Sequence, residues 1–341
     1  TVDPGVSLVI SPGSRQVLAM LAENGALADF VRAGARIIES ACGPCIGQGF
    51  SPADGAVTLR TFNRNFAGRT GTKGDRCYLV SPETAVAAAL TGQFTDPRRL
   101  TKKFGIACPR VAMPKKFLLD DEMLQPPLPP KKALGAEIVR GATIVKPPSG
   151  EKLPATLRGR VILKVGDKIT TDHIMPAGTF LKHRSNVPVY AKYVFHCFNE
   201  EGAPTFAERA LAVKAAGQAG VIVAGDSYGQ GSSREHAALC PMYLGVRAVL
   251  ARTIERIHQA NLVNFAICPL TFADPADYAR VDADDELLVE GLGAAISSAE
   301  TVVVRDVTKG FEFPCRLQLA PRQRKILAAG GLLNYTRDGG R

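Results

Sequence analysis

The chain has 341 residues and carries 42 Lys and Arg against 32 Asp and Glu, a formal net charge of +10 at pH 7. That length corresponds to two ordinary domains, and 46% hydrophobic with 22% charged residues excludes a disordered, collagenous or coiled-coil protein. Charge, Gly or Pro interrupts every apolar stretch before the roughly 18 residues that a membrane-spanning helix needs. We therefore expect a soluble protein with no membrane partner.

Charge and cysteine content bear on function. The surplus positive charge fits either a general attraction for nucleic acid or a site built for a small polyanion, and composition does not choose between them. Eight cysteines are few for a chain too long to need disulfide staples, so we expect a reducing compartment, the cytoplasm. The chain lacks an initiator Met and enters a strand-like run almost at once, which predicts a fragment or a cleaved subunit.

The first forty residues alternate short strands and helices. Strands are expected over 7–10 and 36–39; between them lie a helix that Ser14 caps and a second helix over 26–33. This rhythm predicts an α/β layer with a parallel sheet. The second strand leads directly to Cys42, so we expect the neighbouring cysteines in a loop beyond its C-terminal end, where open α/β sheets bind ligands.

A segment rich in Pro and Lys divides the chain. Eight of the 23 prolines lie within 114–154, which indicates an extended, semi-rigid connector. We expect a first domain over 1–112, a linker over 113–157 and a second domain over 158–341. The elements expected in the second domain are strands at 161–165, 221–225 and 248–251, and helices at 205–216, from about Arg234 and from about Thr253.

The first motif with chemical meaning is Cys42-Gly43-Pro44-Cys45. Its spacing lets both thiolates face one metal centre, as half of a zinc or iron-sulfur site; a redox dithiol and a structural turn are the other interpretations. A dithiol of the thioredoxin type needs a helix after its second Cys. Two Gly and one Pro stand among the next seven residues and the chain has no Trp, so the surroundings favour a metal.

The second motif is the segment 60–69, RTFNRNFAGR. Its three Arg offer forked donors that fit carboxylates or phosphates, and its two Phe hold the loop in place. The simpler interpretation is a solvated basic face. Basic residues interleaved with aromatic ones would also suit RNA.

The third motif is the loop 225–236, GDSYGQGSSREH, expected between a strand and a helix. Glycines let a backbone approach its ligand, and free N–H groups at a helix start attract anions. The loop is not a Walker loop, because no Gly-Lys-Ser/Thr ends it. A Ser beside Arg234 is a candidate base or nucleophile, whereas the simpler interpretation is a helix cap with turn glycines.

The fourth motif is the segment 170–178, TTDHIMPAG, followed by FLKHRSN over 180–186. Asp172 and His173 are candidates for an orienting pair, although neighbours in a strand point to opposite faces. Taken alone, a capping Asp and a His satisfied by other partners explain the pattern as well.

In this order, the segments CGPCIG, NRNFAGR, TTDHI with LKHRSN, and GQGSSREH resemble the aconitase family over nearly the whole chain. The resemblance implies the C-terminal part of a single-chain aconitase. The implied fold is α/β: a partial three-layer α/β domain, which is the end of the cluster-binding third domain, joined by the Pro-rich linker to an aconitase-like swivel domain.

The resemblance also implies roles for single residues. Cys42 and Cys45 match two of the three thiolates that hold a [4Fe-4S] cluster, and Asn63 matches a donor beside it. Ser232 matches the catalytic base, Asp172 an active-site acid, and His173 is a further catalytic candidate. Residues implied to bind the substrate are Arg64, Arg69, Arg184, Ser233 and Arg234.

The activity implied is that of aconitate hydratase, a hydro-lyase of the tricarboxylic acid cycle that interconverts citrate and isocitrate through cis-aconitate. The cluster would act as a Lewis acid on the departing hydroxyl. The family's third cluster cysteine and its upstream Asp, His, Gln and Glu residues have no match in this chain, and we interpret Cys77 and Cys108 as incidental thiols. We therefore expect the chain alone to hold no stable cluster and to be inactive until the missing N-terminal half joins it.

Two alternatives remain open from the sequence. One is an isopropylmalate or homoaconitate isomerase of the same superfamily, against which Arg184 argues, because it matches the arginine that reads the third carboxylate of citrate. The other is RNA binding by a cluster-free protein, which the net charge of +10 permits. A thioredoxin-like oxidoreductase is a more distant third.

Overall fold

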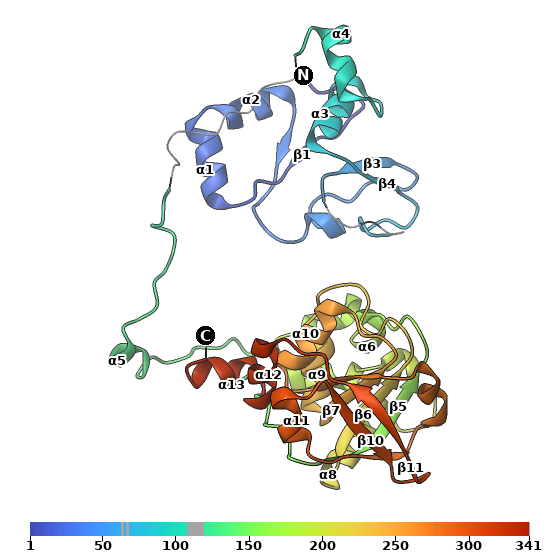
Figure 1. Ribbon diagram of the computed structural model, residues 1–341. Coiled ribbons are helices and arrows are strands. Elements are labelled where there is room, and N and C mark those ends of the chain that lie inside the picture. Colours follow the sequence, from blue (N-terminus) through green and yellow to red (C-terminus); the bar gives the residue numbers. More distant parts are fainter. Residues whose placement is uncertain (63–64, 66–67, 108–118, 341) are drawn as a thin grey trace. The chain divides into compact units, whose positions relative to one another are not determined.

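A computed structural model describes residues 1–62, 65, 68–107 and 119–340 (Figure 1). The chain divides into two compact units, unit 1 over Thr1–Ala136 and unit 2 over Glu137–Arg341. The boundary between them falls in the Pro-rich segment, which contains the short helix α5 (Pro130–Ala133). Along the described part of the chain, no helix is long and apolar enough to cross a membrane.

Unit 1 begins with two short parallel strands, β1 (Val9–Ile10) and β2 (Arg36–Ile37), joined through α1 (Arg15–Glu23) and α2 (Ala26–Ala33). The Ser14 hydroxyl caps α1 by accepting a hydrogen bond from the Val17 N–H at 3.1 Å, so the expected cap is confirmed. Both strands are shorter than expected, because they pair only with each other, over two residue pairs.

The rest of unit 1 holds a second pair of parallel strands, β3 (Val57–Arg60) and β4 (Arg76–Leu79), followed by α3 (Pro82–Thr91), which Ser81 caps, and α4 (Leu100–Phe104). Hydrophobic residues that this unit buries among its described positions are small: Ala35, Ala87, Ala88, Ala89 and, as the one large side chain, Leu100.

Unit 2 is built on a closed barrel of seven strands in the order β10-β11-β8-β7-β6-β5-β9. The strands are β5 (Leu157–Val165), β6 (Ala219–Ala224), β7 (Val246–Ala251), β8 (Cys268–Phe272), β9 (Glu286–Val289), β10 (Thr301–Asp306) and β11 (Phe311–Arg316). The four from β5 to β8 are parallel, and β9 to β11 close the barrel through antiparallel pairs. Only the parallel half contains strands expected from the sequence.

Two hydrophobic clusters lie on opposite faces of these strands because side chains alternate along a strand. Val221 and Val223 of β6 belong to a cluster that the strands enclose, whereas Ile222 and Ala224 belong to a cluster on the outer face. Helices cover both. They are α6 (Thr171–Ile174), α7 (Val187–Tyr190), α8 (Phe206–Ala215), α9 (His236–Tyr243), α10 (Arg256–Asn264), α11 (Leu292–Ser298), α12 (Pro321–Ala328) and α13 (Leu332–Arg337).

The mixture of helices with parallel strands agrees with the expected α/β class. The prediction of a helix over 205–216 is confirmed by α8, whose Thr205 cap exchanges hydrogen bonds with Glu208. The three-layer arrangement of the first domain, the swivel assignment and the domain limits at 112 and 158 stay predictions.

Candidate functional site

Cys42 and Cys45 lie in a loop beyond the C-terminal end of β2, as expected. Both are free thiols, the first exposed and the second half-buried. A single 3-10 turn, η1 (Pro44–Ile46), follows in place of an α-helix. The glycine before it has φ of 147°, a conformation that side chains rarely adopt. The helix on which a thioredoxin-type dithiol depends is therefore not formed here.

Arg60, which ends β3, holds the cysteine loop. Its side chain is only 4% exposed and donates to the Pro44 carbonyl at 2.9 Å and to the Phe50 carbonyl at 3.0 Å. Burial lowers its pKa, against the opposing influence of Cys77, Asp75 and Cys45. This role was not predicted from the sequence; in the structure Arg60 and Thr58 are the two buried positions of β3, on the inward face of the strand.

Arg69 lies beside the same loop. Its Nη2 is 3.4 Å from the Cys45 sulfur. The chain around it packs tightly against the cysteine loop, because a Cβ at Gly47, where φ is 91°, would lie 2.1 Å from the Thr70 carbonyl oxygen. Asn63 and Arg64, the other residues predicted here, fall outside the described residues, as does Cys108. Within the described ranges, no group of three or more His, Cys, Asp and Glu side chains is arranged to hold a metal ion.

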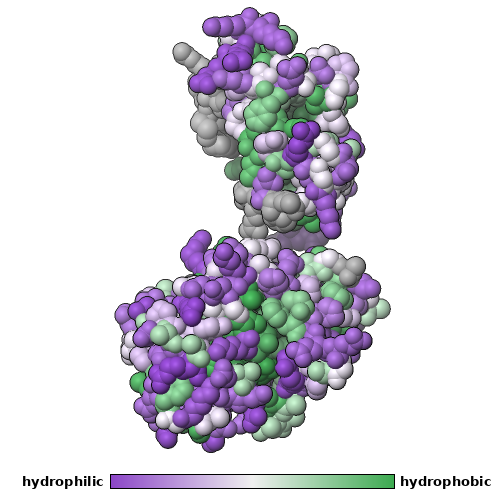
Figure 2. Space-filling model, turned by 90° about the vertical axis from the view of Figure 1, so that its right-hand side faces the viewer, coloured by the Kyte–Doolittle hydropathy of each residue, from purple (hydrophilic) through white to green (hydrophobic). Residues whose placement is uncertain are grey.

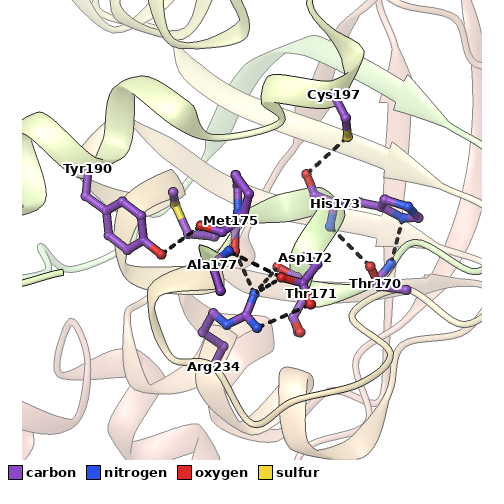
Figure 3. Close-up of polar contacts among 10 residues, drawn as sticks. Thr170, Thr171, Asp172, His173, Met175, Ala177, Tyr190, Cys197 and Arg234 are labelled. Atoms are coloured by element: carbon purple, nitrogen blue, oxygen red, sulfur yellow. Dashed lines mark hydrogen bonds and ion pairs between the residues drawn. The ribbon is translucent and has the colours of Figure 1, made fainter. Parts of the chain in front are cut away.

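In unit 2, Arg234 and Asp172 form an ion pair at the centre of a hydrogen-bond network (Figure 3). The Arg234 Nη1 donates to the Asp172 carboxylate at 2.8 Å and to the Met175 carbonyl at 2.8 Å. The Arg234 side chain is 16% exposed and that of Asp172 63%. The guanidinium thus joins the Ser-rich loop to α6.

The Asp172 carboxyl has a lowered pKa. Burial raises it, but the Arg234 guanidinium and the Ala177 N–H, which donates to Oδ1 at 3.3 Å, together outweigh that effect. Asp172 is therefore an anion at neutral pH in this arrangement, matched to the cation beside it.

The partner of His173 is Thr170, the residue that caps the same helix. Its ring Nδ1 accepts from the Thr170 N–H at 3.1 Å, and its own N–H donates to the Thr170 hydroxyl at 3.1 Å (Figure 3). This reciprocal capping begins α6, and the ring packs edge-on against Phe198. The observed geometry matches the simpler interpretation, a His satisfied by its own helix start.

The Ser-rich loop is held by backbone pairing on both sides. The Gly229 N–H donates to the Ile169 carbonyl at 2.7 Å. The Tyr228 N–H donates to the Thr253 carbonyl at 3.0 Å, and the Tyr228 carbonyl accepts from the Glu255 N–H at 2.9 Å. A Cβ at Gly229, where φ is 85°, would come within 2.2 Å of the His258 ring. The loop thus has little freedom up to Gly229.

Ser232 and Ser233 follow and are exposed. The helix α9 begins at His236, two residues later than expected, because the Arg234 N–H turns back to the Ser232 carbonyl at 2.7 Å. Ser232 therefore lies in the loop before the helix and not in its first turn.

Arg184 is brought near the start of α9 by its backbone. It follows the 3-10 segment η3 (Gly178–His183), and its carbonyl lies 2.9 Å from the His236 Nε2. Tyr190 packs edge-on against the His236 ring, and its hydroxyl donates to the Pro176 carbonyl at 2.9 Å. The fold thus collects the segments of Asp172, Arg184 and Ser232 around one helix end.

Two further residues of this region were missed from the sequence. His236 is the last residue of the loop motif, and its ring nitrogen holds the Arg184 segment through the Arg184 carbonyl. The Thr171 hydroxyl is buried without a partner among the described atoms, and a Cβ at Gly231 would lie 3.6 Å from it. In the sequence, Thr171 is only a polar residue at the start of a short helix, which is a weak indication that its hydroxyl is buried.

The chain resembles known proteins over most of its length. The model of the aconitase family (aconitate hydratase) matches residues 1–92, and that of the aconitase C-terminal domain matches residues 179–275. A mitochondrial aconitate hydratase of Candida albicans is 31% identical over 87% of this chain and 42% of its own. A mitochondrial homocitrate dehydratase of Saccharomyces cerevisiae is 30% identical over 97% of this chain and 47% of its own.

A solved structure, a 3-isopropylmalate dehydratase of Methanocaldococcus jannaschii, is 26% identical with a TM-score of 0.42, covering 54% of this chain and 94% of that one. The chain spans a little under half the length of the curated relatives named above. Those relatives, and others that match, are named as mitochondrial, so the expectation of a cytoplasmic location is wrong. Reducing conditions prevail in more than one compartment, and cysteine usage does not separate them.

One family model falls in unit 1 and the other in unit 2, in the chain order of the motifs, and relatives match across both. This chain belongs to the aconitase family.

Proposed function

We propose that this chain is part of an aconitate hydratase, a hydro-lyase that interconverts citrate and isocitrate through cis-aconitate. The observation that supports this most strongly is the grouping around the start of α9. There an exposed Ser232, the Arg234–Asp172 pair and the Arg184 segment lie in one region of unit 2. A C–H group next to a carboxylate is a weak acid, so the removal of its proton needs a base surrounded by positive charge.

The proposal gives each side chain a task. Ser232 Oγ, as the alkoxide, takes the proton from the carbon next to a substrate carboxylate and becomes the neutral hydroxyl, and the Ser233 hydroxyl donates a hydrogen bond to the substrate. Arg184 and Arg69 bind carboxylates as forked donors. Arg234 is held by Asp172 and by the Met175 carbonyl just after α6, so its guanidinium is fixed before substrate arrives.

The thiols of unit 1 fit part of an iron-sulfur site. Cys42 and Cys45 are free and spaced to face one centre, and the Arg69 Nη2 lies 3.4 Å from the Cys45 sulfur. A [4Fe-4S] cluster held there would supply Lewis-acid chemistry toward the departing hydroxyl. Since no group of three or more His, Cys, Asp and Glu side chains among the described residues is arranged to hold a metal ion, we propose that a further ligand comes from outside this chain, together with the remaining acid-base groups.

The test is to complete the enzyme and compare substrates. The chain is combined with the N-terminal half of a homologous aconitate hydratase, supplied with iron and sulfide, and assayed with citrate, homocitrate and isopropylmalate. We expect citrate turnover only when both parts are present, and a loss of at least about 100-fold in kcat for Ser232→Ala. Ser298→Ala, an exposed Ser in α11, is the matched control and should leave turnover unchanged.

Other results would contradict parts of the proposal. A preference for homocitrate or isopropylmalate over citrate would assign the chain to a sibling enzyme. Stoichiometric cluster absorbance or citrate turnover in the isolated chain would refute the need for an external ligand. Full activity of Ser232→Ala would remove the proposed base.

A further inference from the structure

A cavity of about 730 Å³ opens in unit 2 away from the Ser-rich loop. It lies where the segment 148–156 passes the beginnings of β6 and β7, at Ala219 and Arg247. The Ser-rich loop follows the C-terminal end of β6, and six residues of strand span about 20 Å. The cavity is thus at the other end of the sheet from the site described above.

Four basic residues line this cavity. They are Lys152, Arg158, Lys214 and Arg247, and the one acidic lining residue is Glu151. Arg158 is already neutralised, because it pairs with Glu286, whose other oxygen accepts from Gln218 at 3.2 Å. Three cations therefore face one carboxylate, an excess that suits a dianion.

Arg247 is the most deeply placed of these cations. Its side chain is 13% exposed and its partner, the Glu151 carboxylate at 3.0 Å, is 84% exposed. Burial lowers the Arg247 pKa, with Glu151 partly offsetting this. A solvated carboxylate compensates a buried guanidinium poorly, since exposed ion pairs are weak and desolvated charges are costly. A second anion in the cavity would complete the pairing.

Lys214 is fixed in the wall beside it. The Lys214 Nζ donates to the Tyr243 carbonyl at 2.8 Å, which leaves two of its three donors, and lies over the Tyr243 ring. Its carbon chain packs against Gly245, where a Cβ would approach to 3.0 Å. The ammonium is therefore held in place in advance, which lowers the entropy cost of binding.

The remaining walls suit a small organic molecule. Met242, the Tyr243 ring and Pro148 provide apolar surface beside the cations, and the volume is that of an ordinary ligand pocket. The covering segment is anchored at Gly150, whose carbonyl accepts from the Asn334 side chain at 2.9 Å, and at Ala155, whose carbonyl accepts from the Gly293 N–H at 3.3 Å. The cavity is preformed.

We propose that this cavity binds a phosphorylated small molecule, with the phosphate dianion held by the Arg247 fork and the Lys214 ammonium and the organic part against Met242 and Tyr243. A forked guanidinium and a point-like ammonium are the usual partners of phosphate. The site is independent of the proposed hydro-lyase activity, since it uses none of its residues.

The test is calorimetric titration of the full chain at constant ionic strength with inorganic phosphate, glucose 6-phosphate and citrate. We expect both phosphate probes to bind, the ester more tightly than the free ion. Arg247→Met and Lys214→Met should each weaken binding by about tenfold or more, as the loss of a charged hydrogen bond implies. Arg305→Met, an exposed Arg on β10, changes the net charge equally and should leave the affinity unchanged.

Glu151→Gln is the second decisive variant, because its exposed side chain can be replaced without disturbing the core. It removes the competing carboxylate and should tighten phosphate binding several-fold. Absence of phosphate binding, or equal affinity in Arg247→Met, Glu151→Gln and the unaltered chain, would overturn the proposal. Citrate binding as tight as that of the ester and lost in the same variants would overturn the assignment to phosphorylated ligands.

Discussion

The two units bury hydrophobic side chains to different extents. Unit 2 encloses large residues such as Phe206, Phe272 and Phe313 at 2% exposure or less, in two extensive clusters. In unit 1, the described residues that are both hydrophobic and buried are four Ala and Leu100, while Phe94 is 60% exposed. On the face shown in Figure 2, hydrophobic surface runs through the middle of unit 1 between hydrophilic regions. The stabilisation gained from burial scales with the apolar area removed from water, so hydrophobic burial stabilises unit 2 far more than unit 1.

The units also differ in how they fix their functional loops. In unit 1 one buried guanidinium, that of Arg60, ties the cysteine loop through two carbonyls. In unit 2 the Ser-rich loop is paired through backbone groups on both sides and rests on the His258 ring. A loop held by a few side chains, among them Arg36, whose Nη2 donates to the Gly49 carbonyl at 2.6 Å, is weakened by single substitutions, whereas a backbone-paired loop depends on its underlying core.

The largest effect is expected from truncating a large buried side chain in the core of unit 2. Phe313→Ala removes a ring that stacks on Phe272, and should cost about 3–5 kcal/mol of the free energy of unfolding. Hydrogen exchange of the full chain, resolved by peptide, should show faster exchange throughout unit 2 and no change in unit 1. Phe94→Ala is the matched change in unit 1 and should cost less than about 1 kcal/mol. Equal losses of unfolding free energy in the two variants would contradict the difference in hydrophobic burial between the units.

Acid should destabilise unit 2 through His258. All five His lie in this unit, and burial lowers the pKa of His258 to about 4. The unfolded chain binds a proton at this residue below about pH 6.5 and the folded chain only near 4, so stability falls as pH drops through that window. The loss should approach about 3 kcal/mol at pH 4.

Denaturant midpoints measured from pH 7 to 4 check this expectation. His258→Asn should flatten the dependence on pH, whatever its effect at pH 7, whereas His196→Asn, at an exposed position, should preserve it. An unchanged slope in His258→Asn would show that other groups set the acid sensitivity.

Arg60→Met should release the cysteine loop of unit 1. The Pro44 and Phe50 carbonyls lose their donors, at a cost of about 2 kcal/mol. Alkylation of Cys42 and Cys45, followed by mass spectrometry, should accelerate several-fold. Arg76→Met removes an exposed Arg that donates to the Gly55 carbonyl, and should leave the alkylation rate unchanged. Equal rates in all three proteins would show that the loop is held by other contacts.

The smallest effect is expected at the Asp172–Arg234 pair. Asp172 has a lowered pKa, so the pair stabilises the fold above the ordinary carboxyl range and loses its effect as pH falls through the folded value. Since Asp172 is mostly exposed, Asp172→Asn should cost no more than about 1 kcal/mol at pH 7. Asp29→Asn, in the exposed pair with Arg32 of unit 1, should cost less still. A larger loss of unfolding free energy in Asp29→Asn than in Asp172→Asn would contradict this expectation.

Local patterns predicted much of the fold. The helix over Ala26–Ala33 and the Ser14 cap depend on residues near each other in the chain, and both are found. The antiparallel strands β9 to β11 were not expected, because what makes them strands is pairing across the barrel with partners such as β5 and β8. No window of sequence contains that information.

The candidate site was predictable as a set of segments and not as a set of contacts. The resemblance to aconitases implied that Asp172, Arg184 and Ser232 share one site, and the fold gathers their segments around α9. The partners of each side chain depend on tertiary geometry: Arg234 reaches α6, and His173 caps its own helix. Arg60 and His258 were missed for the same reason, since each acts on a loop distant from it in the sequence.

Closure of the barrel has a consequence for the behaviour of the protein in concentrated solution. A closed sheet has no free edge, so unit 2 offers no template on which another chain can add a strand. Among the residues of unit 1 that the structure describes, the two-stranded sheets β1-β2 and β3-β4 each keep two unpaired edges. Self-association by strand addition should therefore begin in unit 1, and conditions that shield those edges should prolong the life of purified samples.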